Sequence, residues 1–359
     1  ADSAYRGFMI DLARKYLPMH ILRCELRMAA FAKYNAVHLR LLDAERYALK
    51  SEAAAAINTD GIRQYTAEEL RSLDRYAASL GLRVVPEIDF PAHGITVLEK
   101  FPQLHCVKNG EKLGIWTACV AKEGLYELIE TLIAELGGIF GGEYVHIGGD
   151  ELGFRDLKEL KRWAYWEQCD DCRALFEKYG YLDESDLLCH FLRRVYGIAK
   201  RHGKKLAMWN DCVDISRSPD LPRDILVYFW RIAYPGRGPH AGCSLDRWLE
   251  EGFSVVNCFF EETYLDDFVE EEKLLCWNPK NSPKIEAKNE KGIVGGQLNV
   301  FEVKHHYAYS LPSALLICGD RLWNDAALTD TARAAEDLDR QLVGVGEDIP
   351  EFFRTIGQL

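Results

Sequence analysis

Residues 144–151 of this chain read Tyr-Val-His-Ile-Gly-Gly-Asp-Glu, an apolar run that ends on two adjacent acids. The apolar residues are typical of a strand that is buried on both faces. Gly148 and Gly149 allow a sharp turn, or a close approach by another segment. Asp150 and Glu151 then lie at the carboxyl end of the strand, where α/β enzymes place their chemistry. The alternative is an acidic cap on a following helix, but this position favours a functional pair.

Seven further apolar runs have the length of strands, and helical patterns separate most of them. These runs cover residues 6–11, 36–42, 83–89, 205–211, 225–230, 253–260 and 293–301. Eight strands that alternate with helices predict parallel pairing and right-handed crossovers, hence a (β/α)8 TIM barrel with loop insertions. A doubly wound sheet would need a Gly-rich phosphate loop after the first strand, and residues 10–13 are not one. We expect one catalytic domain over residues 1–359, with residues 325–359 as a helical tail packed on the barrel.

The composition limits the classes of partner. The chain has 359 residues, 48% of them hydrophobic, and a net charge of −12, which argues against a nucleic-acid partner. No apolar run is long enough to span a membrane. A homodimer is compatible with the sequence.

The cysteines bear on compartment and on metal binding. There are 11 of them, mostly beside apolar segments, so we expect buried free thiols and a cytoplasmic location. The start of the chain lacks Met, which leaves a trimmed, secreted form open. Cys169 and Cys172 form a CxxC motif, but no second pair is evident, and we expect a surface loop there instead of a metal site.

The carboxyl ends of the strands would form one ring in a barrel. Acids and aromatics dominate that ring: Asp11, Asp43, Asp89 with His93, Asp150 with Glu151, Asp211, Trp230, Tyr264 with Asp266, and Glu302. Aromatic faces stack on sugar rings and carboxylates accept sugar hydroxyls, so the ring suits a carbohydrate. A metal site made of Asp11, Asp89, Asp150 and His93 is chemically feasible, but nothing in the spacing demands it. We therefore predict no metal and no cofactor.

The adjacency of the two acids indicates a mechanism. Most glycosidases place two carboxylates across the sugar from each other, roughly 5–5.5 Å or 6.5–9.5 Å apart. Neighbours at one strand end fit better if the carbonyl oxygen of a 2-acetamido group on the substrate is the nucleophile. One acid then protonates the leaving oxygen, and the other holds the acetamido N–H.

The chain resembles the glycoside hydrolase family 20 β-N-acetylhexosaminidases from about Tyr5 to Trp323. The similar segments occur in the family's order: residues 6–11, 35–38 with Asp43, 86–93, 146–151, 264–266, 295–297 and 320–323. The His-x-Gly-Gly-Asp-Glu element is specific.

The resemblance implies a role for each site residue. Glu151 is the general acid/base with a raised pKa, Asp150 orients the acetamido group, and Tyr264 bonds to its oxygen. By the same resemblance, Arg6 binds sugar hydroxyls, Trp230 and Trp248 wall the pocket, and Asp266 lies near the acetamido group. Asp89 and His93 form a relay behind Glu151, and His146 supports the site from behind.

The rim of the site departs from the family pattern. Phe301 stands where the family has Trp, and Glu302 comes one residue earlier than the family's Glu. Residues 43–48 also differ from the family's run after the second strand, with Ala48 at its end.

The resemblance implies an exo-acting, retaining β-N-acetylhexosaminidase that acts on glycans with a terminal β-linked N-acetylhexosamine. The alternatives are a carbohydrate-binding member with weak or lost catalysis, specificity for a modified hexosamine, and a metal-dependent hydrolase that uses Asp11 and Asp89.

Overall fold

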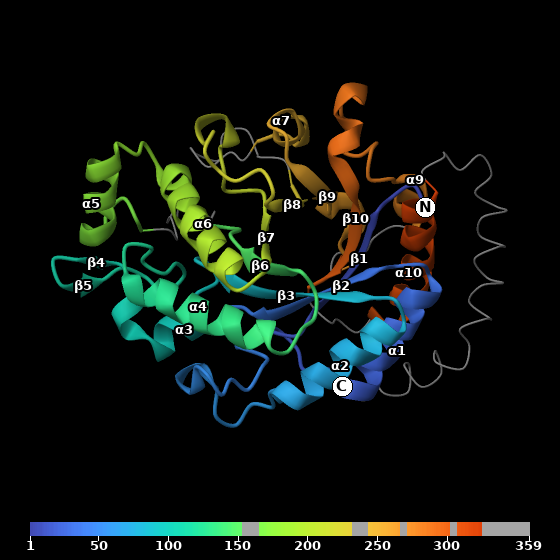
Figure 1. The fold of residues 1–359 in the computed structure, drawn as a ribbon, viewed down its shortest axis with the longest axis horizontal. Helices are drawn as coiled ribbons and strands as arrows, with labels where there is room; N and C mark the ends of the chain where they lie inside the picture. Colours follow the sequence, from blue (N-terminus) through green and yellow to red (C-terminus); the bar gives the residue numbers. More distant parts are fainter. Residues whose placement is uncertain (153–164, 232–242, 266–270, 302–306, 325–359) are drawn as a thin grey trace.

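The computed structural model describes residues 1–152, 165–231, 243–265, 271–301 and 307–324. Eight parallel strands close into a barrel in the order β1-β10-β9-β8-β7-β6-β3-β2 (Figure 1). They are β1 (Tyr5–Asp11), β2 (Ala36–Leu42), β3 (Arg83–Phe90), β6 (Tyr144–Gly148), β7 (Lys205–Trp209), β8 (Leu226–Phe229), β9 (Ser254–Asn257) and β10 (Ile293–Val300). The predicted TIM barrel is confirmed, and the doubly wound sheet is excluded because the sheet has no edges.

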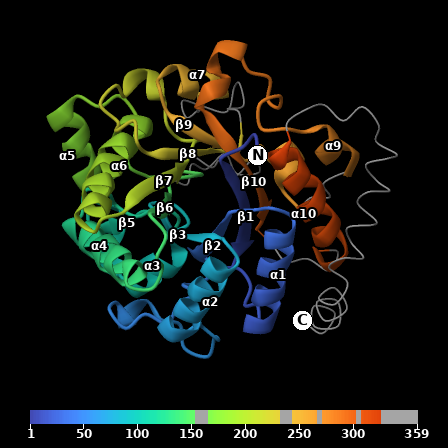
Figure 2. The same cartoon turned by 45° about the vertical axis from the view of Figure 1, so that its right-hand side comes forward.

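Helices surround the barrel (Figure 2). The main ones are α1 (Met19–Phe31), α2 (Ala67–Ser79), α4 (Glu123–Gly137), α6 (Glu184–Arg201), α7 (Leu245–Glu250) and α10 (Tyr307–Trp323). Shorter elements lie in the connections: α3 (Ile95–Lys100), α5 (Asp170–Tyr179), α8 (Phe260–Thr263), α9 (Glu271–Cys276) and the hairpin β4 (Val107–Lys108)–β5 (Glu111–Lys112). The predicted alternation is wrong in one place. Residues 210–225, which join β7 to β8 and are all described, contain only the short 3-10 turn Ile215–Arg217.

Local sequence explains where these elements begin. Thr66 opens α2 with a capping box, in which its hydroxyl accepts from the Glu69 N–H and the Glu69 carboxylate accepts from the Thr66 N–H. Such a cap stabilises a helix by about 1 kcal/mol.

The tail at residues 325–359 lies outside the described residues. Among the described helices, none is long and apolar enough to cross a membrane.

The strands are buried on both faces, as their apolar runs predict. Inside the barrel, a small cluster of Met9, Ala207, Trp209, Leu226, Tyr228, Val256 and Cys258 fills the space, and a much larger apolar layer separates strands from helices. Trp209 is 1% exposed and belongs to this inner core. The carboxyl ends of the strands all open on one face, where the connections build the site.

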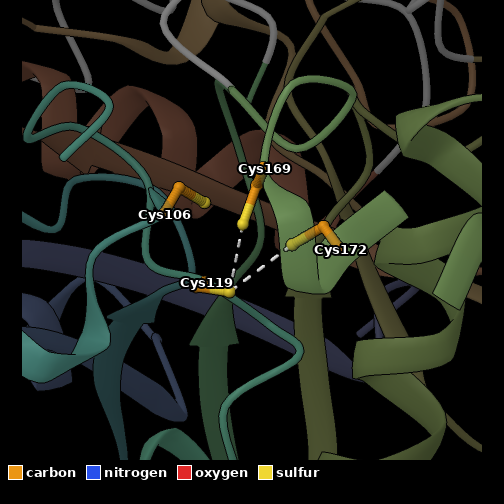
Figure 3. A group of neighbouring side chains, drawn as sticks. All are labelled: Cys106, Cys119, Cys169 and Cys172. Atoms are coloured by element: carbon orange, nitrogen blue, oxygen red, sulfur yellow. Dashed lines mark hydrogen bonds between the residues drawn. The ribbon is translucent and has the colours of Figure 1, made fainter. Parts of the chain in front are cut away.

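Two of those connections are joined by cysteines. Cys169 and Cys172 lie at the start of α5, and both are fully buried, so the predicted surface loop is wrong. A second pair is present as well. Cys106 and Cys119, from the connection between β3 and α4, lie against them (Figure 3). The sequence gives no sign of this pairing because the two connections are far apart along the chain.

Candidate active site

The turn after β6 presents the acid pair. Gly148 and Gly149 have φ of +78° and +90°, which side chains rarely adopt. A Cβ on Gly148 would lie 1.8 Å from Oδ1 of Asp89, whereas one on Gly149 would meet nothing within 4 Å. The first glycine therefore admits the Asp89 carboxylate, and the second only turns the chain. Glu151 itself has φ of +55°, a strained conformation of the kind that occurs at functional sites.

Asp150 and Glu151 face a cavity of about 190 Å³ at the carboxyl end of the barrel. Its lining combines acids, cations and aromatic rings: Arg14, Arg40, His93, Asp150, Glu151, Trp230, Tyr264 and Phe301. Six of the predicted site residues are among them: Asp150, Glu151, His93, Tyr264, Trp230 and, just after the end of β10, Phe301.

His93 links the two acids. Its Nε2 atom lies 3.3 Å from Glu151 Oε2 and 3.6 Å from Asp150 Oδ2. Its Nδ1 atom lies 2.9 Å from Asp43 Oδ1, and its ring is 3% exposed. Burial disfavours the charged imidazolium, yet Asp89, Asp43 and Asp150 together hold the pKa of His93 well above its ordinary value. His93 is therefore a cation that touches both carboxylates from the same side of the cavity.

The relay behind Glu151 contains His93 as predicted, but the acid that bonds to His93 is not the predicted Asp89. Asp89 was expected behind His93, but its Oδ2 atom lies 3.8 Å from Nε2, and its carboxylate bonds to Arg40 instead. Asp43 takes the place on Nδ1. The sequence could have indicated Asp43, because it directly follows the second strand and therefore lies among the strand ends that form the site.

The two acids titrate differently. Burial raises the pKa of Asp150 to about 6, although His93 and Arg40 favour its ionised form. Burial also opposes ionisation of Glu151, but the adjacent His93 imidazolium, with help from Arg231 and Arg40, lowers its pKa below the ordinary value. The predicted rise in the pKa of Glu151 is therefore wrong for the free protein, because His93 outweighs burial.

The backbone of Glu151 is held on both sides. Its N–H donates to Asp211 Oδ2 at 3.2 Å, and its carbonyl accepts from the Trp116 indole at 3.3 Å. Asp211 in turn accepts from the indole of Trp230 at 3.0 Å. The predicted wall residue Trp230 is thus tied to the backbone of the acid.

Three aromatic rings form one wall. Tyr264 stacks on Phe301 with centroids 4.8 Å apart, and Trp230 stacks on Tyr264 at 6.0 Å. The guanidinium groups of Arg14 and Arg40 also lie over the Phe301 ring. Flat apolar faces next to charged groups fit a sugar, which has apolar ring faces and polar edges.

Arg14 is a site residue that the sequence interpretation missed. It lines the cavity and pairs with Asp11 at 3.0 Å and Asp43 at 2.8 Å. Arg6, predicted to bind sugar hydroxyls, lies at the opposite end of β1. Its guanidinium donates to the carbonyls of Lys33 and Ser3, so this prediction is wrong. Side chains near the start of a strand cannot reach the site at its end.

Four other predicted residues do not line the cavity or lie outside the described residues. Trp248 is fully buried in α7, where it packs on Phe253 at 5.0 Å, and it does not line the cavity. His146 lies inside the barrel, with Nδ1 3.3 Å from Glu87, one layer below the acid pair. Asp266 and Glu302 lie outside the described residues.

Arg40 supplies positive charge beneath the cavity. It is fully buried and bonds to Asp43 at 2.6 Å, to Glu87 at 3.0 Å and to Asp89. Two acidic groups at the site have a spacing that would fit a cation, Asp43–Asp89–His93 and Glu87–Asp89–Asp150. Both contain carboxylates that Arg40 already contacts, so a metal there would compete with a guanidinium. Asp11, named for the metal-dependent alternative, instead pairs with Arg14.

The comparisons with known proteins agree on one family. Residues 4–301 match the model of the glycosyl hydrolase family 20 catalytic domain. A beta-hexosaminidase of Porphyromonas gingivalis is 26% identical over 96% of this chain and 47% of its own length. One from Akkermansia muciniphila is 27% identical over 73% of this chain and 53% of its own. The chain thus spans about half the length of the curated relatives it matches.

Solved structures show the same fold. A family 20 exo β-N-acetylglucosaminidase from Vibrio harveyi, solved with N-acetylglucosamine, superposes with a TM-score of 0.77 at 21% identity, covering 98% of this chain and 58% of that one. A chitobiase from Flavobacterium johnsoniae has the same TM-score at 23% identity, covering 97% and 52%. Because the family model matches most of the chain, this protein belongs to glycoside hydrolase family 20.

Proposed function

We propose that this chain is an exo-acting, retaining β-N-acetylhexosaminidase that uses the 2-acetamido group of its substrate as nucleophile. The observation that carries the proposal is the contact of one imidazole, His93, with both Asp150 and Glu151. The two acids therefore lie on the same side of the cavity. Adjacent acids at one strand end that share one imidazole fit a mechanism in which the substrate supplies the nucleophile.

The first step follows from this arrangement. The acetamido carbonyl oxygen attacks the anomeric carbon, the glycosidic bond breaks, and Glu151 gives a proton to the leaving oxygen. Asp150 accepts a hydrogen bond from the acetamido N–H and stabilises the positive charge of the oxazolinium ring. Its Oδ1 atom is buried and has no hydrogen-bond partner among the described residues, so an acceptor is ready at this position.

The second step restores the enzyme. Glu151, now ionised, takes a proton from water, and the oxygen of that water attacks the anomeric carbon from the face the leaving group left. The oxazolinium ring opens and regenerates the acetamido group. Two inversions give net retention of the β configuration.

The proton on Glu151 needs a source, because the pKa of this acid is low in the free protein. His93 is charged and lies 3.3 Å from Glu151 Oε2. When a sugar displaces water from the cavity, a neutral pair of carboxylic acid and imidazole is favoured over a desolvated ion pair. We propose that the proton on Nε2 of His93 then passes to Glu151, while Nδ1 remains hydrogen-bonded to Asp43.

The terminal position of the sugar is suggested by the size of the cavity. It is about 190 Å³ and is closed below by Arg40 and its acids, so one ring enters and the chain beyond it stays outside. The names of the relatives, beta-hexosaminidases, support the hexosamine class. Phe301 in place of the family's Trp leaves open a modified terminal sugar, or binding with little turnover.

A panel of aryl glycosides tests the proposal. We expect hydrolysis of aryl N-acetyl-β-glucosaminide or its galacto epimer, release of the β-anomer first by NMR, and no turnover of aryl β-glucoside, which lacks the acetamido group. Glu151→Gln should lower kcat by about 10²–10⁴-fold. Glu127→Gln, on the exposed face of α4, is the matched control.

Two results would count against the proposal. Comparable turnover of the aryl β-glucoside would mean that the acetamido group is not the nucleophile. Tight binding of the N-acetylated sugars with no turnover of any substrate, including 6-substituted ones, would favour the carbohydrate-binding alternative.

A further inference from the structure

Four cysteine side chains converge next to the catalytic face. Cys106, Cys119, Cys169 and Cys172 are each 0% exposed, and their sulfur atoms all lie within 4.8 Å of one another (Figure 3). Cys119 Sγ lies 3.5 Å from Cys172 Sγ and 3.6 Å from Cys169 Sγ. The proposed hydrolysis makes no use of this cluster.

These distances are too long for disulfides and short enough for a shared ion. A disulfide joins its sulfurs at about 2.05 Å. Four thiolates around a tetrahedral zinc ion, at a bond length of about 2.3 Å, lie about 3.8 Å apart. The two S–S distances from Cys119 are close to that value, and no two of the four sulfurs are more than 4.8 Å apart, so one ion could contact all four after small shifts.

The charges near the cluster suit an ion held by thiolates. Four thiolates and Zn²⁺ carry a net charge of −2, which a neighbouring cation and a helix amino terminus would offset. Lys122 interacts electrostatically with Cys119 and Cys169 and pairs with Asp171 at 2.5 Å. Cys169 and Cys172 are at the amino-terminal end of the ten-residue helix α5.

We propose that Cys106, Cys119, Cys169 and Cys172 bind one structural Zn²⁺ ion that fastens the β3–α4 connection to the start of α5. Four protein ligands complete the tetrahedron, so no position is left for water or substrate, and the ion has a structural role.

The position of the cluster links it to the active site. Cys119 lies three residues after Trp116, whose indole donates to the carbonyl of Glu151 and whose ring lies 4.5 Å from that of His93. Ala118, between them, accepts from the indole of Trp166 at 2.9 Å. The ion would therefore fix the segment that packs Trp116 against the relay. The cysteines are positioning residues, since they touch no reacting atom.

Metal analysis of the purified full chain tests this proposal without any substrate. The chain is expressed with zinc present and purified without chelators. We expect about one zinc ion per chain by inductively coupled plasma mass spectrometry. Cys119→Ser and Cys172→Ser should each lose most of that zinc. Cys189→Ser, which alters a buried thiol in α6 outside the cluster, and Cys276→Ser, which alters an exposed one, should keep it.

A second measurement covers variants that fail to fold. Cobalt exchanged into the wild-type chain should give the strong visible absorption of a tetrahedral thiolate complex, and a mercurial reagent that blocks thiols should abolish it. Three results would overturn the proposal: wild-type chain that holds no metal even after incubation with zinc, a disulfide between any two of the four cysteines, or full zinc content in both cluster variants. Because no result depends on turnover, the zinc site and the proposed hydrolysis can fail separately.

Discussion

Asp150 and Glu151 are neighbours in the chain, yet their carboxyl groups have different surroundings. Asp150 is buried, with a pKa raised to about 6, whereas the charged His93 lowers the pKa of Glu151. Two acids whose environments separate their pKa values can take separate roles in acid–base chemistry. In the free protein the order of the two pKa values is the reverse of the roles in the proposed mechanism, in which Asp150 acts as the anion and Glu151 carries a proton received from His93.

The raised pKa of Asp150 predicts the acid side of the pH–rate profile. Asp150 has to be ionised to accept the acetamido N–H, so kcat/KM should fall as the pH drops through about 6. Asp150→Asn should remove that limb and lower kcat by about 10²–10³-fold, as expected for loss of one group that stabilises developing charge. The measurement is kcat/KM from pH 4.5 to 8. A limb that persists unchanged in the variant would assign it to another group.

The arginines of the first strand and its loop provide a matched pair. Arg14 lines the cavity, and Arg6 lies at the far end of β1. Arg14→Ala should raise KM by about tenfold or more, which is the effect of losing one charge-assisted hydrogen bond to the sugar. Arg6→Ala should leave kcat and KM unchanged, even if the protein unfolds at a lower temperature. Equal effects of the two substitutions on KM would contradict the placement of the sugar.

Among the secondary-structure elements, the end of β6 determines how the acid pair is presented. Gly148 and Gly149 share a positive φ, but only Gly148 lies against a side chain, the carboxylate of Asp89. The strand stops where these residues leave extended geometry, and the acids follow at once. The turn is therefore as important to the site as the acids are.

Alanine at each glycine separates backbone strain from steric overlap. Gly149→Ala should cost about 1–2 kcal/mol of unfolding free energy, because only its positive φ is disfavoured. Gly148→Ala should cost more and should also lower kcat, because Asp89 has to move away from Arg40. Urea denaturation and steady-state kinetics measure the two effects. A similar loss of stability for both variants would show that the Asp89 contact is unimportant.

In the molecule as a whole, a charged layer closes the barrel beneath the site. Arg40 of β2 reaches Glu87 and Asp89 of β3, and Glu87 in turn contacts Trp209 of β7 and His146 of β6. Burial opposes ionisation of Glu87, but Arg40, His146 and His38 hold its pKa well below the ordinary value. Four strands thus meet through one guanidinium and one carboxylate.

Removal of Arg40 should reveal the cost of its buried partners. Arg40→Met removes the guanidinium that Glu87 and Asp89 share, whereas Asp43 keeps Arg14 and His93, and we expect a loss of about 3–5 kcal/mol in unfolding free energy at neutral pH. Arg75→Met breaks an exposed pair with Glu68, 2.9 Å apart, and should change stability by less than about 1 kcal/mol. Chemical denaturation compares the two. A small effect at Arg40 would mean that the acids are neutral in the folded protein.

The sequence by itself determined the barrel, its strands and the identity of the acid pair. Apolar runs of strand length, the capping box at Thr66 and the Gly-Gly-Asp-Glu turn are local features, which neighbouring residues in the chain specify almost alone. The tertiary structure decided what depends on contacts between distant segments: Arg14 in the cavity instead of Arg6, Asp43 on His93 instead of Asp89, a lowered pKa for Glu151, and a second cysteine pair beside Cys169 and Cys172. Electrostatic shifts and side-chain partners arise only when the barrel closes, because closure brings together charges and thiols that are far apart in the chain.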